Sequence, residues 1–320
     1  MTEFSFSIVL PTHNRPAMLA EAIDSLRAQS LGNLEVIVVD DQSTPNVDSR
    51  SLGQVHGHPV RLLRNDTSIG GAASKTAGAR QARGDFIGFL DDDDLLDPRY
   101  IQTLNAAFVS HPDVDLFFVD VEWFGDAPLA SDRSHRSAAE AVIASTSHRK
   151  ESDGCILFDS GLPAALIVST PMQFQRPVLR RKVLDIVGGF RPECLLWDCD
   201  WAIRAAFQVR CGYIPQSLYR QREQGQGYFS RPGRALAMAE SIYEIADRVR
   251  RDPPIHVNAA TQCMLDNLTG KMAFDLAYVQ SQQGEFSAAM RHWWISQRLS
   301  PQIGRLKFPV GALWRALASR

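Results

Sequence analysis

Residues 84–94 have the sequence Gly84-Asp85-Phe86-Ile87-Gly88-Phe89-Leu90-Asp91-Asp92-Asp93-Asp94, in which a short apolar run ends in four consecutive carboxylates. A strand that is buried along its length cannot carry acids, so the change at Asp91 marks its carboxyl end. Ligands of open α/β sheets bind at this edge. Adjacent acids repel one another, and a hard divalent cation such as Mg²⁺ or Mn²⁺ would neutralise part of their charge. The alternative is a solvated acidic turn before a helix, because Asp97-Pro98 is by itself a good helix start.

The composition is that of an ordinary soluble protein. The chain has 320 residues, of which 45% are hydrophobic and 22% charged, enough for two average domains or one large α/β domain with an appendage. The net charge of -2 provides no basic field, so we expect no nucleic-acid partner. Five cysteines without a Cys-x-x-Cys pair argue against a zinc site or a disulfide scaffold and favour the reducing cytoplasm. No signal peptide is visible, and no apolar stretch approaches the ~18 residues of a membrane span.

Strand and helix patterns alternate over the first ~120 residues, which predicts a mostly parallel sheet with helices on both faces. Buried strands are expected at residues 6–10, 34–39, 60–63, 86–90 and 114–119. Helices are expected between them, from Pro16 to about residue 30, at residues 72–82 and at residues 98–110. The second strand also ends in acids, Asp40-Asp41, and a right-handed crossover would place the acid-bearing strand ends side by side.

Three later features each allow two interpretations. The glycine pair at residues 70–71 could present N–H groups to a phosphate, although such a pair is more often only a turn. Residues 125–152 are polar, and we interpret them as an insertion or a mobile loop. Asp198 and Asp200 stand between tryptophans before a helix expected from Trp201; bulky apolar neighbours would raise their proton affinity, and the alternative role is helix capping.

The last third of the chain is predicted to be helical. Helices are expected at residues 235–251, 259–283 and 286–299, with the small and large alternation of one unit resembling a tetratricopeptide repeat. The final segment, from Trp293 through Trp314 to Arg320, combines tryptophan with basic residues and almost no acids. This composition suits peripheral contact with an anionic membrane, or equally a core-facing helix with a solvated basic side.

Six short motifs in this order resemble those of a family 2 glycosyltransferase, an inverting enzyme with the GT-A fold. They lie at residues 9–15, 38–43, 71–85, 89–94, 188–190 and 197–200. The resemblance extends from Ser7 to about Arg222. It implies a Rossmann-like GT-A domain over residues 1–230, with a nucleotide-sugar-binding half (1–120) and an acceptor-binding half (121–230), followed by a helical C-terminal region (231–320).

The resemblance also implies roles for individual residues. The nucleotide sugar would be held by Pro11, Thr12, His13, Arg15, Asp40, Asp41, Lys75, Asp91 and Asp92. Asp93, with Asp91, would bind Mn²⁺ or Mg²⁺. Asp198 would be the catalytic base, with Asp200 as the alternative, because Trp197 stands where the family has Glu. Arg220, Arg222 and Tyr228 would close over the diphosphate, unless they lie on a solvated loop.

Together these expectations describe an inverting, metal-dependent, hexosyltransferase-type enzyme. It would move a sugar from a nucleoside-diphosphate sugar, with UDP favoured, to a glycan or glycolipid hydroxyl in surface polysaccharide or glycan biosynthesis, in the cytoplasm or on the cytoplasmic face of a membrane. A sugar-nucleotide pyrophosphorylase should instead show a glycine-rich signature after the first strand, where residues 11–16 contain no glycine. A nucleotide-sugar-binding protein with weakened catalysis is the third interpretation, and Trp197 supports it.

Overall fold

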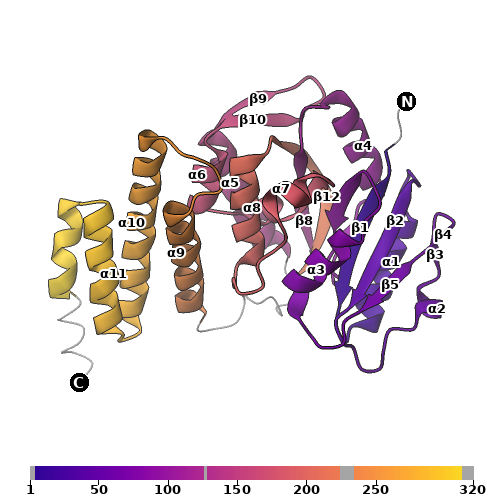
Figure 1. Cartoon of the computed structure of the whole chain (residues 1–320), viewed down its shortest axis with the longest axis horizontal. Coiled ribbons are helices and arrows are strands. Elements are labelled where there is room, and N and C mark those ends of the chain that lie inside the picture. Colours follow the sequence, from indigo (N-terminus) through magenta and orange to yellow (C-terminus); the bar gives the residue numbers. More distant parts are fainter. Residues whose placement is uncertain (1–3, 126–127, 224–233, 312–320) are drawn as a thin grey trace. The chain divides into compact units, whose positions relative to one another are not determined.

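The computed structural model describes residues 4–125, 128–223 and 234–311 of the chain (Figure 1). The chain divides into two compact units, one of residues 1–193 and 197–225 and the other of residues 194–196 and 226–320. The predicted domain boundary at residue 230 lies outside the described residues, and the roles assigned to the two halves of the first domain stay predictions. Within the described ranges, no helix combines the length and the apolar character needed to cross a membrane.

The first unit is built on one large sheet with the strand order β5-β2-β1-β6-β11-β8-β12-β10-β9. Four strands that run parallel to one another form its first half: β1 (Phe6–Thr12), β2 (Leu34–Asp40), β5 (Arg61–Arg64) and β6 (Phe86–Phe89). β11 (Pro177–Arg180) enters antiparallel between β6 and β8 (Leu116–Gly125), and β12 (Cys211–Glu223) is parallel to β8. The remaining strands are β7 (Leu95–Leu96), β9 (Ser147–Lys150), β10 (Ile156–Ser160) and the small hairpin of β3 (Gln54–Val55) and β4 (His58–Pro59). The predicted α/β fold is confirmed.

Helices cover both faces of the parallel strands (Figure 1). On one face, α1 (Pro16–Arg27) and α4 (Tyr100–Ser110) share an apolar core with Ile8 and Val36. On the other face, α3 (Gly70–Arg80) lies very close to the sheet, because a Cβ atom on Gly78 would stand 2.4 Å from Cγ1 of Val9. The remaining helices of this unit are α2 (Ser49–Leu52), α5 (Pro128–Ala144), α6 (Leu162–Val168), the short η1 (Met172–Gln175), α7 (Val183–Val187) and α8 (Trp197–Gln208).

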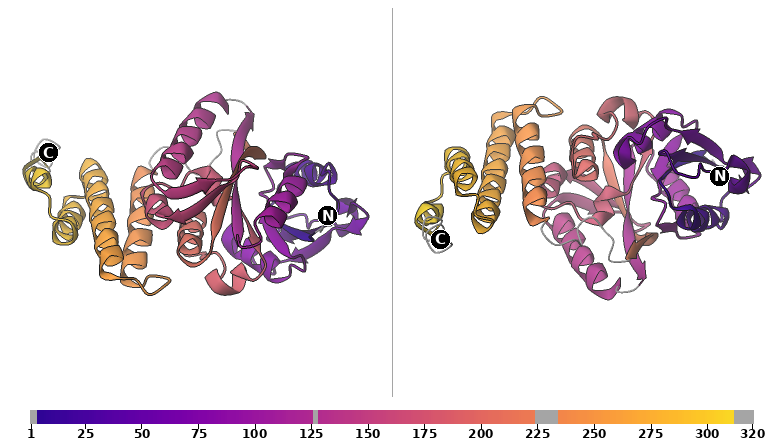
Figure 2. Two further views of the ribbon diagram at one scale, coloured as in Figure 1. Left: turned by 90° about the horizontal axis from the view of Figure 1, so that it is seen from above. Right: turned by 90° about the horizontal axis from the view of Figure 1, so that it is seen from below.

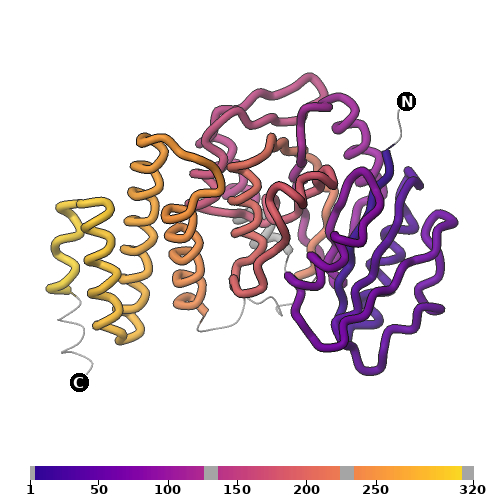
Figure 3. The backbone as a smooth tube through the Cα atoms, viewed as in Figure 1, coloured from indigo at the N-terminus to yellow at the C-terminus, as the bar shows by residue number. Residues whose placement is uncertain are grey.

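The strand order places the acid-bearing strand ends differently from the prediction. β2 and β6 are not neighbours, because β1 lies between them. The chain winds outward from β1 to β2 and β5 and then returns to the other side of β1, a path that can be followed in Figure 3. This reversal creates a switch point at the carboxyl end of β1, which is where open α/β sheets bind ligands.

Three further local predictions are wrong. β1 continues to Thr12 rather than ending at Leu10, because Pro11 keeps the parallel register with Val39 of β2. Residues 128–144 form α5 and residues 147–150 form β9, so the interpretation of residues 125–152 as a mobile loop is wrong, whereas their interpretation as an insertion stays a prediction. The small apolar side chains of Ala139 and Val142 are buried on this helix. α8 begins at Trp197, so the two acids that follow lie in its first turn and not ahead of it.

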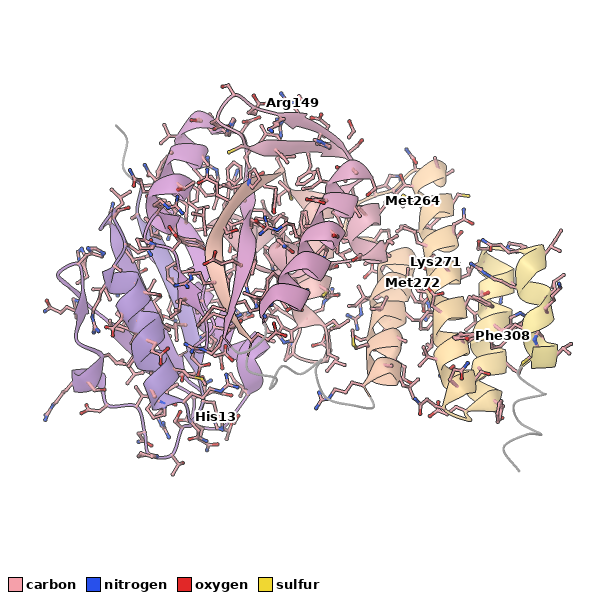
Figure 4. All side chains as sticks on the ribbon, turned by 180° about the vertical axis from the view of Figure 1, so that it is seen from behind. His13, Arg149, Met264, Lys271, Met272 and Phe308 are labelled. Carbon is pink, nitrogen blue, oxygen red and sulfur yellow. The ribbon has the colours of Figure 1, made fainter. Side chains whose placement is uncertain are left out.

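The described part of the second unit is helical, as predicted. It contains α9 (Ala235–Arg251), α10 (Ala259–Gln282), α11 (Phe286–Leu299) and the short η3 (Ile303–Lys307). α10 packs against α9 and against α11, and the three helices lie side by side in both views of Figure 2. Phe308, labelled in Figure 4, closes the small core between α10 and α11 by contacting Phe274.

Candidate active site

The acid run lies directly after β6, at the edge of the sheet where β1 and β2 also end. In Figure 4, His13 marks this end of the first unit, and Arg149 on β9 lies at the opposite end. A pocket of about 440 Å³ lies between α1 and residues 43–52, which include α2. Thr12 and Arg15, two of the predicted nucleotide-binding residues, line this pocket.

Asp91 is held between two buried cations. Its Oδ1 lies 2.5 Å from Nζ of Lys75 on α3, and its Oδ2 lies 3.1 Å from the guanidinium of Arg176. Burial opposes ionisation of this carboxyl group, but Lys75 and Arg176 outweigh that effect and lower its pKa to about 2. Asp91 is therefore an anion at every physiological pH, and both of its oxygens already have a positive partner.

Asp92 and Asp93 face the end of β1. Asp92 accepts hydrogen bonds from the Thr12 hydroxyl (2.7 Å) and from Arg15 (3.0 Å). Asp93 accepts from the same guanidinium on Oδ2 (2.8 Å), and its side chain is 37% exposed. The structure thus brings four of the predicted nucleotide-binding and metal-binding residues into one hydrogen-bonded group.

Asp94 is buried and has a different environment from Asp91. Its carboxylate accepts hydrogen bonds from the Tyr219 hydroxyl and from the backbone N–H of Arg222, each 2.8 Å long. Burial and the charges of Asp91 and Asp93 raise its pKa to about 7, against the opposing effect of Arg176. Two acids of one run are therefore held at very different proton affinities, a pattern that is typical of reaction centres.

Asp198 reaches this site because α8 is tied to α3. Gly189 comes so close to Thr76 that a Cβ atom would stand 2.3 Å from Cγ2 of the threonine, and the Phe190 N–H donates to the Thr76 hydroxyl at 2.9 Å. The Phe190 ring then contacts the edge of Trp197, with centroids 5.0 Å apart. The predicted Gly-Gly-Phe motif thus positions the first turn of α8 over α3.

The charges that act on Asp198 come from the acid run and its cations. Burial raises the pKa of Asp198, and Asp91 adds to the rise, while Arg176 and Lys75 oppose it. The ammonium of Lys75 also lies 4.9 Å from the centre of the Trp197 ring. Because an aromatic face stabilises a cation, Trp197 contributes to holding Lys75 without adding a second acid beside Asp198.

Asp200, the alternative base, is bound by arginine side chains and has a structural role. It is fully buried, and its two oxygens accept hydrogen bonds from Arg204 (2.8 Å) and Arg191 (3.2 Å). Arg204 in turn donates to the carbonyl oxygens of Val187 and Gly189. Asp200 therefore anchors the loop that precedes α8, and this environment favours Asp198 as the base.

Asp40 and Asp41 organise the loops around the site. Asp41 is 5% exposed, and each of its oxygens accepts two hydrogen bonds, from Asn65 and the N–H of Ile69 on Oδ1 and from Ser68 and the N–H of Gly70 on Oδ2. Asp40 is fully buried and accepts from Arg64 and from two backbone N–H groups. The nucleotide-binding role of both acids stays a prediction, because their oxygens are occupied by the chain itself.

His13 is exposed at the end of β1, where a base could stack on it. Its Nδ1 lies 2.6 Å from the Asp41 carbonyl oxygen, and its Nε2 lies 2.9 Å from the Asn14 amide nitrogen. A carbonyl can only accept and an amide nitrogen can only donate, so the proton of the neutral ring is on Nδ1. The imidazole is therefore held by its edge.

Three contacts of the acid run were not predictable from local sequence. Arg176 precedes β11, while Tyr219 and Arg222 lie on β12. Arg222 donates from Nε to the Asp93 carbonyl (2.8 Å) and pairs with Glu21, so it lies on a strand and not on a solvated loop. Arg220 is also on β12, and Tyr228 lies outside the described residues.

The metal-binding prediction fits Asp93 better than Asp91. Both oxygens of Asp91 face cations, whereas Asp93 accepts a hydrogen bond from Arg15 on Oδ2 and is partly exposed. Mg²⁺ is often held by one or two carboxylates together with substrate phosphates, so one exposed carboxylate is a sufficient protein ligand. In the described part of the chain, the acid run does not bring three ligand atoms within 4.8 Å of one another, so substrate oxygens or water molecules would complete the shell of a bound cation.

Comparison with known proteins identifies the relatives of this chain. The family model for Glycosyl transferase family 2 matches residues 7–155. The uncharacterized glycosyltransferase YwdF of Bacillus subtilis is 32% identical over 215 residues, which covers 65% of this chain and 70% of YwdF. An uncharacterized glycosyltransferase of Haemophilus influenzae is 36% identical over 112 residues, 35% of this chain and 37% of that protein.

A relative with a named reaction is the Escherichia coli UDP-Glc:alpha-D-GlcNAc-diphosphoundecaprenol beta-1,3-glucosyltransferase WfgD, 32% identical over 95 residues, 30% of this chain and 37% of WfgD. The chain spans between 13% and 37% of the length of the first four curated relatives it matches.

Solved structures share the fold. S. aureus TarS 1-349 in complex with UDP-GlcNAc has a TM-score of 0.66 at 16% identity, covering 98% of this chain and 88% of that chain. The mannosyltransferase PcManGT from Pyrobaculum calidifontis, in complex with GDP-Man and Mn²⁺, has a TM-score of 0.59 at 15% identity, covering 99% and 81%. At these identities the likeness concerns the fold.

We predict that Asp41→Asn lowers the free energy of unfolding at pH 7 by about 1–3 kcal/mol, because an amide nitrogen would face N–H donors that now have an acceptor. Burial opposes ionisation, but the hydrogen bonds from Ile69, Asn65 and Ser68 lower the pKa of Asp41. The stabilisation is thus present above the unfolded pKa of about 3.9 and is lost as the pH falls through the lower folded value.

Urea unfolding between pH 7 and pH 3 checks this prediction. The wild type and Asp41→Asn should differ most at neutral pH and converge in acid. Asp66→Asn, which changes an exposed acid of the loop that donates hydrogen bonds to Asp41, is the matched control and should leave stability unchanged. Equal stabilities of the wild type and Asp41→Asn at pH 7 would contradict the structural role given to this carboxylate.

Proposed function

This chain belongs to glycosyl transferase family 2, and on that premise we propose that it transfers a sugar from a nucleoside-diphosphate sugar to a hydroxyl group of a glycan or glycolipid acceptor. The observation that carries the proposal is the meeting of two groups at one sheet edge. The acid run after β6 stands with its cations Lys75 and Arg176, and the charges of these residues act on Asp198 from α8.

Asp198 would act as the general base. The acceptor hydroxyl must lose its proton as it attacks the anomeric carbon, and a carboxylate within hydrogen-bond reach can take that proton. Burial raises the pKa of Asp198, which strengthens it as a base, while Arg176 and Lys75 limit the rise. One base and an in-line attack without a covalent intermediate would invert the anomeric configuration.

The donor would bind along the end of β1 and the acid run. Thr12 and Arg15 are held there by Asp92, with Arg15 46% exposed and able to reach a diphosphate. A UDP-sugar is the favoured donor, because the relative WfgD is named for UDP-Glc and TarS was crystallised with UDP-GlcNAc. The relative AmsB of Erwinia amylovora is named as an amylovoran biosynthesis glycosyltransferase, and this similarity favours a place in polysaccharide biosynthesis.

Trp197 supports a second candidate, a nucleotide-sugar-binding protein without turnover. It occupies the position where the family resemblance places Glu, and its ring lies against Lys75. A sugar-nucleotide pyrophosphorylase is disfavoured, because the family match begins at the first strand and the loop after it contains no glycine.

We predict that Asp198→Asn lowers the transfer rate on the order of 10²–10⁴-fold while donor binding is nearly unchanged, because only the proton acceptor is removed. The measurement is UDP release from UDP-sugars with a GlcNAc-diphospholipid acceptor, together with calorimetric donor binding. Asp185→Asn, an exposed acid of the same unit, is the control.

The outcomes of this assay separate the candidates. UDP release that requires the acceptor supports the transferase, and full activity of Asp198→Asn would refute the assigned base. Saturable binding of a UDP-sugar without turnover by the wild type would identify the binding protein. Pyrophosphate-dependent formation of a nucleoside triphosphate would identify a pyrophosphorylase.

We also propose that Asp93 holds a divalent cation, Mn²⁺ or Mg²⁺, when the donor is bound. The support is its exposed carboxylate, together with the Mn²⁺ named in the structure of PcManGT. When bound, the cation would act as a Lewis acid that stabilises charge on the leaving diphosphate. Lys75 and Arg176 would keep Asp91 ionised beside it, and Arg15 would orient the second oxygen of Asp93.

We expect Asp93→Asn to weaken Mn²⁺ binding in the presence of UDP by roughly tenfold or more, because a neutral amide replaces an anionic oxygen ligand. Titration of Mn²⁺ followed by electron paramagnetic resonance measures this without turnover. Asp97→Asn changes an acid beyond β7 that pairs with Arg99, and its Mn²⁺ affinity should equal that of the wild type. An unchanged affinity in Asp93→Asn would remove Asp93 from the metal site.

For the helical unit, we propose peripheral contact with the cytoplasmic face of an anionic membrane. Residues 286–311 carry no acid, and three of their basic side chains are exposed: Arg291, Arg298 and Lys307, whereas Arg305 is buried. Four large apolar side chains of this segment are exposed: Trp294, Ile303, Leu306 and Val310. Exposed apolar groups beside basic residues suit a lipid headgroup region, and WfgD is named for a lipid-linked acceptor. Trp314, Arg315 and Arg320 lie outside the described residues.

Co-sedimentation with lipid vesicles tests the membrane proposal. The wild type should bind vesicles that contain phosphatidylglycerol more strongly than pure phosphatidylcholine vesicles, and added salt should weaken binding. The double variant Trp294→Ser/Ile303→Ser should bind less, whereas Val168→Ser, which removes an exposed apolar side chain of the first unit, should not. Equal binding to both vesicle types would contradict the proposal.

A further inference from the structure

Arg176 reaches the acid run through the topology of β11. This strand is antiparallel to β6, with Leu179 opposite Ile87 and Arg180 opposite Phe86. The residue before β11 therefore stands at the edge where β6 ends and the acids begin. Arg176 belongs to the second half of the first unit, whereas Asp91 and Asp94 belong to the first half.

The guanidinium of Arg176 is fixed from several sides. It lies 3.1 Å from Oδ2 of Asp91 and 3.9 Å from Oδ2 of Asp94, and its centre is 5.1 Å from the centre of the Tyr219 ring. Tyr219 completes the arrangement, because its hydroxyl donates to Asp94 at 2.8 Å and accepts from the N–H of Asp91 at 3.2 Å. One arginine and one tyrosine thus fix both ends of the acid run.

The charge of Arg176 also affects Asp198, the proposed base. Its charge is foremost among those that oppose the rise in the pKa of Asp198. Its side chain is 6% exposed, and its Nε–H is buried without a hydrogen-bond partner among the described residues. A buried donor that the protein does not satisfy is typical of a site that receives a ligand atom or a water molecule.

We propose that Arg176 is a positioning residue of the transfer reaction, which holds the donor-side acids Asp91 and Asp94 in a fixed place relative to Asp198. This inference rests on the proposed function. The planar guanidinium can contact two carboxylates at once, whereas a lysine ammonium at the same site is a single point charge. Lys75 binds the other oxygen of Asp91, so loss of Arg176 would leave that acid held on one side only.

The test compares Arg176→Gln and Arg176→Lys with Arg180→Gln. Arg180 is on β11 itself and donates to the carbonyl oxygens of Val114 and Pro112, away from the acid run. Steady-state UDP release gives kcat and the donor KM, and thermal unfolding reports folding. Arg176→Gln should lower kcat on the order of 100-fold with a much smaller change in donor KM, because displaced reacting groups reduce the rate. Arg176→Lys should recover part of the loss, and Arg180→Gln should keep the wild-type kcat.

Each outcome decides the inference. If Arg176→Gln fails to fold, Arg176→Lys keeps the buried charge, and its kcat is then compared with that of Arg180→Gln. Folded Arg176 variants whose kcat equals that of Arg180→Gln would overturn the positioning role and leave the proposed function intact. A tenfold or larger rise in donor KM with unchanged kcat would also overturn it, because Arg176 would then serve ground-state binding alone. Absence of turnover in the wild type would overturn the proposed function and this inference with it.

Discussion

The carboxylate of Asp91, held between Lys75 and Arg176, is the interaction on which the organisation of the site depends. It joins α3, the end of β6 and the start of β11 at one point. Four consecutive acids would repel one another if they were buried without partners. They are tolerated here because each has a positive or hydrogen-bonding partner, supplied by β1, the loop between β1 and α1, α3, β12 or the segment before β11.

The same charge arrangement gives the acids different chemical properties. The pKa of Asp91 falls to about 2 because two cations outweigh its burial, while burial and neighbouring acids raise the pKa of Asp94 to about 7. Burial also raises the pKa of Asp198. Acids with a lowered pKa and acids with a raised pKa thus lie within one group, a pattern that is typical of acid–base sites. The Trp197 ring stabilises Lys75 by its face, so no further acid is needed there.

Packing of α8 on α3 brings Asp198 to the acid run and its cations. Gly189 allows the loop before α8 to touch Thr76, and Asp200 with Arg204 holds that loop from the other side. Neither contact involves the acids of the run, yet both determine where the first turn of α8 lies. The family match ends at residue 155, so α8 and the base candidate Asp198 lie outside the matched residues.

The amino-acid sequence by itself determined the α/β class and the carboxyl end of β6 at Asp91, since apolar runs and charge changes are local signals. The resemblance of its motifs to a family also indicated Asp198 as a candidate base, which stays a prediction. It also indicated the helices of the last third. Only the tertiary structure decided that β1 separates β2 from β6, that Asp41 and Asp200 are occupied by the chain, and that Arg176 and Tyr219 hold the acid run. The physical reason is that the partner of a charged group depends on distance in space. Here that distance follows from the antiparallel entry of β11 and from the packing of α8 on α3. Neither arrangement leaves a pattern among residues that are neighbours in the sequence.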